Sequence, residues 1–196
     1  EKGIRNSCAL PYELHANGAL SNDQKTFQIN FAAGTKLQQA NSGAPFQVYT
    51  PGKYDGEIMR TRNYAVKAGD TITDFWHLSQ FENNSYHFRV YGPNGFYREF
   101  IGNDKDPLEL TTHYQIDNKP TQSFTGNLAL TLSNKSTGAL EIEITDNAYR
   151  SAKRKLKIES KLDRTISIEL GKSFNWYDLS INIIGHPYFS QRIAGR

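Results

Sequence analysis

GPNGFYREFIG (residues 92–102) and GHPYFSQRIAG (residues 185–195) are two versions of one sequence. Each begins with Gly, has Phe at its fifth position and closes with Gly ten residues on. The correspondence extends upstream, where Tyr86 matches Tyr177 at a separation of 91 residues. A repeat of about 90 residues is the size of a small domain and is longer than the ~20–50 residues of a solenoid unit. The chain is therefore predicted to contain two copies of one domain.

Large apolar residues alternate with polar residues in many short stretches that are separated by turn sequences rich in Gly, Pro and Asn. The clearest of these stretches are residues 27–31, 128–132, 140–144, 166–170 and 179–183. A period of two is typical of half-buried antiparallel strands. Each copy has room for about seven such strands, as in an immunoglobulin-like sandwich. The fold class expected is all-β, with two tandem immunoglobulin-like antiparallel β-sandwich domains.

The boundary between the copies is expected in the polar stretch around residues 103–107, which follows the first closing Gly. This places the first β-sandwich copy in residues 1–104 and the second in residues 105–196. The copies differ most in residues 49–64, where the first copy has a longer connection. A long loop on a rigid sandwich is a suitable place for function, but it is equally a place where an insertion is tolerated.

The composition excludes several classes of protein. A content of 11 Tyr and 11 Phe against one Met suits strands, and a net charge of +3 is too small for a nucleic-acid partner. No apolar run is long enough to span a membrane, and no secretory leader is visible. Cys8 is the only cysteine, so an internal disulfide is impossible. The chain begins at Glu1, and we interpret it as an excised fragment or a processed product.

Motifs for catalysis are missing from the sequence. The five histidines are scattered without metal-ligand spacing, and the motifs of nucleophilic hydrolases, P-loops and dinucleotide-binding folds do not occur. We therefore expect no catalytic residue, no metal and no cofactor in this chain.

One basic run is a candidate binding site for lipid or a partner. It consists of Arg150, Lys153, Arg154, Lys155 and Lys157. Near an anionic membrane each Lys or Arg can contribute about 1 kcal/mol. Alternatively, the run is a lysine-rich edge strand that discourages edge-to-edge pairing. The second interpretation is favoured.

Four aromatic residues offer another alternative. Exposed in a row, Trp76, Tyr86, Trp176 and Tyr177 would suit a carbohydrate-binding β-sandwich, whereas buried they are core residues. Because Trp76 aligns with the apolar Ile168 of the second copy, the pattern favours core positions.

Five motifs, in this order, resemble the tandem C-terminal domains of the bacterial phosphocholine-specific phospholipase C family, which includes non-hemolytic and hemolytic members. They are LPYELH (residues 10–15), YGPNGF (91–96), TDNAY (145–149), WYDLS (176–180) and QRIAG (191–195). The resemblance covers nearly the whole chain.

The resemblance implies a function for the parent protein. Such enzymes are exported in folded form by the twin-arginine route to the periplasm or the extracellular space. They hydrolyse phosphatidylcholine, and in some members sphingomyelin, to phosphocholine and diacylglycerol or ceramide, in lipid catabolism. Their catalytic centre lies in an N-terminal domain of which this sequence has no counterpart.

By this resemblance, the chain is expected to be a non-catalytic accessory region that braces the catalytic domain or positions it on lipid. Its partners would be the N-terminal catalytic domain of the same polypeptide and a choline-lipid membrane surface. A free-standing carbohydrate binder is the alternative. An independent lipolytic enzyme is the least favoured reading, because no nucleophile–base pair can be assembled from the motifs.

Overall fold

The first copy is a sandwich of two antiparallel sheets. The computed structural model describes residues 12–34, 42–117 and 123–196. One sheet contains β1 (Leu14–Leu20), β2 (Thr26–Ala33) and β7 (Thr71–His77) in the order β1-β2-β7. The facing strands are β3 (Ala44–Tyr49), β6 (Thr61–Val66), β8 (Ser85–Tyr91) and β9 (Tyr97–Asn103). Short 3₁₀ turns, η1 (Leu78–Gln80), η2 (Glu82–Asn84) and η3 (Pro93–Gly95), connect them.

The second copy repeats this arrangement. Its three-stranded sheet has the order β10 (Leu108–Ile116), β11 (Phe124–Asn134) and β14 (Asp163–Ile168). The facing strands are β12 (Leu140–Asp146), β13 (Arg154–Ile158), β15 (Tyr177–Ile183) and β16 (Ser190–Gly195), and η4 (Gly171–Ser173) precedes β15. The predicted fold class of two all-β sandwiches is confirmed. In the first copy β6 pairs with β3, and in the second copy β13 pairs with β12. In a constant-type immunoglobulin domain the corresponding strand belongs to the opposite sheet.

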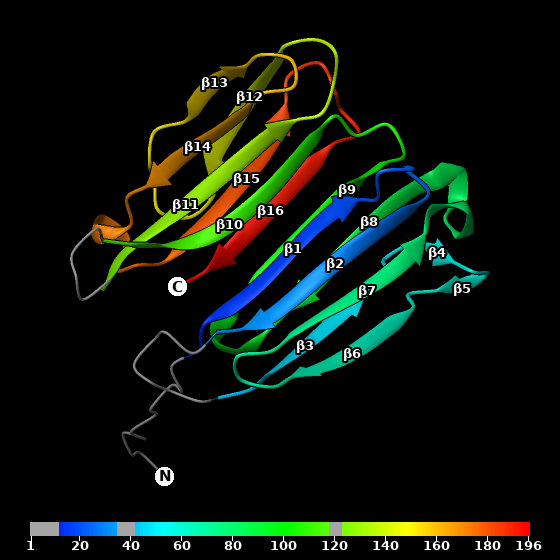
Figure 1. Cartoon of the computed structure of the whole chain (residues 1–196), viewed down its shortest axis with the longest axis horizontal. Helices are drawn as coiled ribbons and strands as arrows, with labels where there is room; N and C mark the ends of the chain where they lie inside the picture. Colours follow the sequence, from blue (N-terminus) through cyan, green and yellow to red (C-terminus); the bar gives the residue numbers. More distant parts are fainter. Residues whose placement is uncertain (1–11, 35–41, 118–122) are drawn as a thin grey trace.

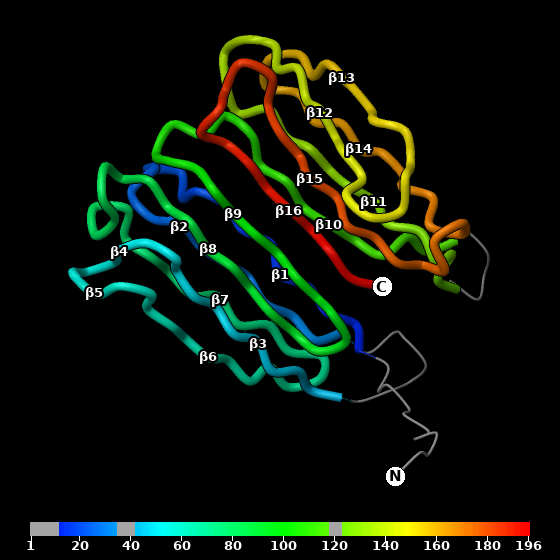
Figure 2. Tube along the Cα trace, turned by 180° about the vertical axis from the view of Figure 1, so that it is seen from behind, coloured from blue at the N-terminus to red at the C-terminus, as the bar shows by residue number. Residues whose placement is uncertain are grey.

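The two sandwiches share one continuous sheet (Figures 1 and 2). The last strand of each copy pairs antiparallel with the other, which gives eight strands in the order β13-β12-β15-β16-β9-β8-β3-β6. Glu99 lies opposite Arg192 at the centre of this pairing. Because β9 and β16 are equivalent strands of the repeat, their pairing relates the copies by an approximate two-fold axis through this residue pair.

The alternation seen in the sequence produces two separate cores. The first is largely aromatic, with Phe27, Phe31, Phe46, Trp76, Phe88 and Phe100 nearly or fully buried. The second is aliphatic and is built mainly from Leu and Ile, including Leu130, Leu132, Ile142 and Ile181. Different side chains thus fill the same framework in each copy.

The closing Gly of each repeat has a steric reason. Gly102 lies opposite Tyr86 in the β8–β9 pair, and Gly195 lies opposite Tyr177 in the β15–β16 pair. A Cβ atom at Gly195 would lie 2.7 Å from the Tyr177 hydroxyl oxygen, and one at Gly102 would lie 2.5 Å from that of Tyr86. Both glycines therefore leave room for a buried tyrosine to lie across the neighbouring strand.

The long connection of the first copy folds into a small hairpin. Its strands are β4 (Lys53–Tyr54) and β5 (Glu57–Ile58), which pair antiparallel beyond the end of β3. The ring of Tyr54 is buried and contacts Trp76 and Phe81, with centroid distances of 4.9 and 4.7 Å. The connection is therefore anchored in the core of the first sandwich.

Candidate functional site

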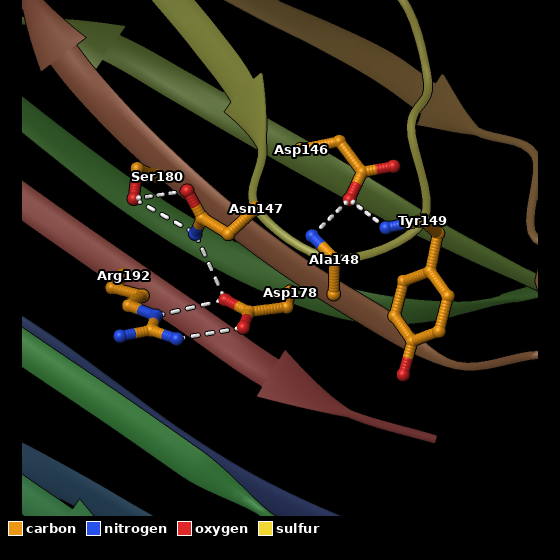
Figure 3. Close-up of polar contacts among 7 residues, drawn as sticks. All are labelled: Asp146, Asn147, Ala148, Tyr149, Asp178, Ser180 and Arg192. Carbon is orange, nitrogen blue, oxygen red and sulfur yellow. Dashed lines mark hydrogen bonds and ion pairs between the residues drawn. The ribbon is translucent and has the colours of Figure 1, made fainter.

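A polar cluster lies on the outer face of the eight-stranded sheet, where β12 ends and the chain turns toward β13 (Figure 3). The Asp146 carboxylate accepts backbone hydrogen bonds from Ala148 and Tyr149, at 3.0 and 2.8 Å, and from Ser151 at 2.9 Å. Burial raises the pKa of Asp146, but these three donors outweigh burial and lower the pKa overall. The carboxylate thereby fixes the turn that carries Asn147.

Asn147 joins this turn to the neighbouring strand. Its Nδ2 donates to Asp178 Oδ1 at 2.9 Å and to Ser180 Oγ at 3.0 Å. Arg192 on β16 holds the same carboxylate from the other side, with Nε and Nη2 at 2.8 and 2.7 Å from Asp178. This two-point contact from Arg192 lowers the pKa of Asp178.

A second network lies on the other side of the junction, within the first copy. Glu99 accepts a hydrogen bond from Arg89 Nε at 2.7 Å and lies 2.7 Å from Nε2 of His87. Arg89 Nη1 also donates to the Tyr49 hydroxyl at 2.9 Å. Burial raises the pKa of Glu99, but the contacts with Arg89 and His87 lower it overall. Charged side chains therefore form paired contacts along the centre of this face.

A groove follows the same junction, and we call it the seam groove. It has a volume of about 540 Å³ and is lined by Arg89, Tyr91, Gly92, Gly95, Phe96, Tyr97, Glu99, Arg192 and Ala194. Both arginines already contact carboxylates, and the lining contains no Ser, Cys or Lys nucleophile beside a general base. The groove therefore presents arginine side chains that carboxylates hold in place.

Buried contacts beneath this face fix the two copies to each other. The Arg98 side chain is 1% exposed and extends from β9 into the second copy. Its Nη1 donates to the backbone oxygen of Ala194, and its Nη2 donates to the Tyr177 hydroxyl, each at 2.9 Å. In the opposite layer, Thr112 N donates to Asn17 Oδ1 at 3.1 Å. The junction is therefore bonded in both layers of the sandwich.

The predicted basic run lies at the edge of the eight-stranded sheet. Lys153 and Lys155 contact Glu143 of β12 at 3.1 and 3.8 Å, and Lys157 contacts Glu159 at 2.8 Å. The remaining members are Arg154, whose Nη1 donates to the Ser167 backbone oxygen at 2.9 Å, and the exposed Arg150. Among the strands that the structure describes, β13 pairs with β12 alone, so the run has the edge position that the favoured interpretation requires.

The proposed carbohydrate-stacking row is wrong. Trp76, Tyr86 and Tyr177 are all at most 3% exposed, which leaves only the half-buried Trp176 of the four candidates. The two tyrosines are buried because they lie across the closing glycines, and Trp76 contributes to the first core. A sugar ring therefore has no exposed row of these aromatic side chains on which to stack.

The polar cluster was not predicted as a unit, although the sequence marked three of its segments as motifs (residues 145–149, 176–180 and 191–195). Asp146 and Asp178 are far apart in the sequence, and only the pairing of β12 with β15 brings their segments together. Among the described residues, no three His, Cys, Asp or Glu side chains are placed to hold a metal ion. Within the same residues, no helix is long and apolar enough to cross a membrane. Cys8 and the start of the first motif lie outside the described residues.

Comparison with known proteins connects the chain to one family. The model for the bacterial phospholipase C, C-terminal domain matches twice, at residues 6–103 and 108–196. All of this chain aligns with non-hemolytic phospholipases C from Pseudomonas aeruginosa and Burkholderia pseudomallei, at 32% identity in each case. A hemolytic phospholipase C from Pseudomonas aeruginosa is 31% identical. The chain spans 27%, 26% and 28% of the length of these three relatives.

Proposed function

Because the chain belongs to the bacterial phospholipase C, C-terminal domain family, we propose that it is a non-catalytic accessory region of an exported phospholipase C. The observation that carries this proposal is the double family match, which leaves only a few residues of the chain unmatched. The relatives are about four times as long as the chain. Catalysis is thus assigned to a separate N-terminal domain of the same polypeptide, which is the chain's first partner.

The expected reaction of the parent enzyme is hydrolysis of phosphatidylcholine or sphingomyelin to phosphocholine and diacylglycerol or ceramide. The paired charges in and around the seam groove support a binding role for this chain, because each arginine that lines the groove is held by a carboxylate. A surface with fixed side chains loses little conformational entropy when a partner binds. We assign the seam groove to contact with the catalytic domain.

The basic run is proposed to protect the open edge of β13, with contact to anionic lipid as its second role. The ion pairs of Lys153 and Lys155 with Glu143 make lipid contact the second role, because they reduce the free positive charge that would attract anionic lipid. Lysine at an exposed edge disfavours pairing with another strand. The division into residues 1–104 and 105–196 is proposed as one of ancestry, since hydrogen bonds in both layers join the copies.

The test compares a phospholipase C that carries this chain with the same enzyme truncated before it. We expect truncation to lower phosphocholine release from phosphatidylcholine vesicles at least tenfold, and the isolated chain to release none. Equal release by the full-length and truncated enzymes would refute the accessory role. Release by the isolated chain that persists through purification would refute the non-catalytic assignment.

A further inference from the structure

Large apolar side chains are exposed in turns at one end of the molecule. Ile58 and Met59, at the end of the second hairpin strand, are 68% and 62% exposed, and Tyr188 before β16 is 75% exposed. Leu162 after β13 and Ile184 after β15 are 56% and 44% exposed. Exposed apolar residues that occur singly are ordinary on protein surfaces, but a group in neighbouring turns indicates a binding surface.

The strand register places these turns at the same end of the eight-stranded sheet. β8 begins beside the end of β9, and β16 begins beside that same end. β13 ends beside the start of β12, which pairs there with the end of β15. The β4–β5 hairpin follows the end of β3, in the direction in which β8 begins. Figure 1 shows this hairpin projecting from the first sandwich.

The turns form a nearly continuous border, which we call the loop rim and define as residues 51–60, 78–84, 104–107, 159–162 and 184–189. Lys53 Nζ of the hairpin lies 3.6 Å from Glu82 of η2. Asn84 Nδ2 donates to Asp104 at 3.2 Å. This hydrogen bond joins residues 78–84 to residues 104–107, the segment that leads into the second copy. The loop rim therefore extends over both sandwiches.

The hairpin holds Ile58 and Met59 in a fixed position. Tyr54 anchors it in the core, while Met59 N donates to the Gly52 backbone oxygen at 3.3 Å. Asp55 and Met59 both have left-handed backbone conformations, with φ of 52° and 55°. Residues other than Gly rarely adopt this conformation unless their surroundings impose it. Ile58 and Met59 thus stay extended into solvent instead of folding back onto the sandwich.

Charge distinguishes the loop rim from the basic run. Acidic and basic side chains nearly balance in it: Asp55, Glu57, Glu82, Asp104 and Glu159 stand against Lys53, Arg60, Lys105 and Lys161, while Asp106 is bound by Tyr86. A nearly balanced surface has no excess positive charge to attract an anionic bilayer, whereas the outermost group of a choline lipid is a cationic trimethylammonium that the exposed carboxylates can attract. Tyrosine, as at Tyr188, is also enriched at the boundary between lipid and water.

We propose that the loop rim contacts the surface of a zwitterionic lipid bilayer, with Ile58, Met59 and Tyr188 entering its headgroup region. This inference deepens and rests on the accessory role proposed above. The remaining fold is compatible with it, because β1 begins and β16 ends at the opposite end of the sandwiches. A catalytic domain that precedes β1 would enter there and leave the loop rim free to contact lipid.

The experiment measures co-sedimentation of this chain with pure phosphatidylcholine vesicles at low salt and at high salt. The test variants are Ile58→Ser with Met59→Ser, and Tyr188→Ser. The matched control is Phe174→Ser, since Phe174 is 81% exposed but lies before β15, at the opposite end of the sheet. A second control reverses charge in the basic run, with Lys153→Glu and Lys155→Glu.

We expect the chain to bind phosphatidylcholine vesicles with little salt dependence. The hairpin double variant is expected to lower the partition coefficient at least tenfold, and Tyr188→Ser severalfold, while both controls bind as the parent chain does. The inference is overturned if the chain does not sediment with these vesicles, or if Phe174→Ser weakens binding as much as the hairpin variant. Loss of binding only at high salt or on charge reversal would assign lipid contact to the basic run instead. The truncation experiment tests the accessory role separately, so either proposal can fail without the other.

Discussion

Arg98 Nη2 donates a hydrogen bond to the hydroxyl of Tyr177 at 2.9 Å, and both side chains are almost completely buried. The first residue belongs to β9 of the first copy and the second to β15 of the second. The Arg98 guanidinium also lies 4.1 Å from the centre of the Phe96 ring. A buried cation held by a hydroxyl, backbone oxygens and an aromatic ring makes the two sandwiches depend on one another.

Arg98→Ala is expected to lower the free energy of unfolding by about 3 kcal/mol, because it leaves buried acceptors unpaired and creates a cavity. Urea unfolding followed by circular dichroism measures this change. Arg150→Ala, at an exposed position, serves as the control and should stay within about 0.5 kcal/mol of the parent chain. Two well-separated unfolding transitions in the parent chain would contradict the predicted dependence between the copies.

Gly195→Ala is expected to destabilise the chain by about 1–3 kcal/mol, because the new methyl group overlaps the Tyr177 hydroxyl. Thermal unfolding provides the measurement. Gly138→Ala is the matched control, since a Cβ atom there would meet no atom within 4 Å. Tyr177→Phe alone removes the hydrogen bond with Arg98, so the steric explanation predicts that its combination with Gly195→Ala is less destabilised than the sum of the two single variants. A purely additive double variant would argue against that explanation.

Asp106→Asn is expected to change how stability depends on pH. Burial raises the pKa of Asp106 to about 6, although its carboxylate accepts hydrogen bonds from Tyr86 and from the Asn103 backbone. Since the folded-state pKa is above the unfolded value of 3.8, the contribution of Asp106 to stability is full below pH 4 and is lost as pH rises through 6. The variant should therefore gain on the order of 2 kcal/mol relative to the parent chain between these pH values.

Urea unfolding of both proteins from pH 4 to pH 7 checks this prediction. The other shifted carboxylates described above have lowered pKa values and act in the opposite direction, but they are common to both proteins. The difference between the two curves therefore isolates Asp106. Parallel curves across this range would show that the Asp106 carboxyl titrates normally.

Lys155→Val with Lys157→Val is expected to increase self-association, because β13 pairs on one side only and these lysines protect its open edge. Sedimentation velocity over a range of protein concentrations measures the fraction of dimer and higher species. Lys25→Val with Lys172→Val makes the same change in charge and hydrophobicity at exposed positions away from β13, and should leave the association state of the parent chain unchanged. Equal association of both double variants would attribute the effect to general loss of charge.

The local pattern of the sequence determined the strands and the duplication. Alternation with a period of two fixes which face of a strand is buried, and the repeated Gly and Tyr follow from direct contacts between neighbouring strands. The same pattern correctly favoured core positions for Trp76, Tyr86 and Tyr177. These features depend on residues close in sequence or on pairs within one copy. The sequence of each segment is therefore enough to predict them.

Only the tertiary structure decided how the copies join and which polar groups meet. The pairing of β9 with β16 places Arg98 beside Tyr177 and Glu99 opposite Arg192, although about 80 to 90 residues separate the partners. Alternation does not specify which edge strand becomes the neighbour of another, because any two edges present equivalent backbone donors and acceptors. Burial of Arg98 and Asp106 likewise depends on how complete sandwiches pack together. The physical reason is that strand formation is encoded locally, whereas docking is selected by long-range side-chain complementarity.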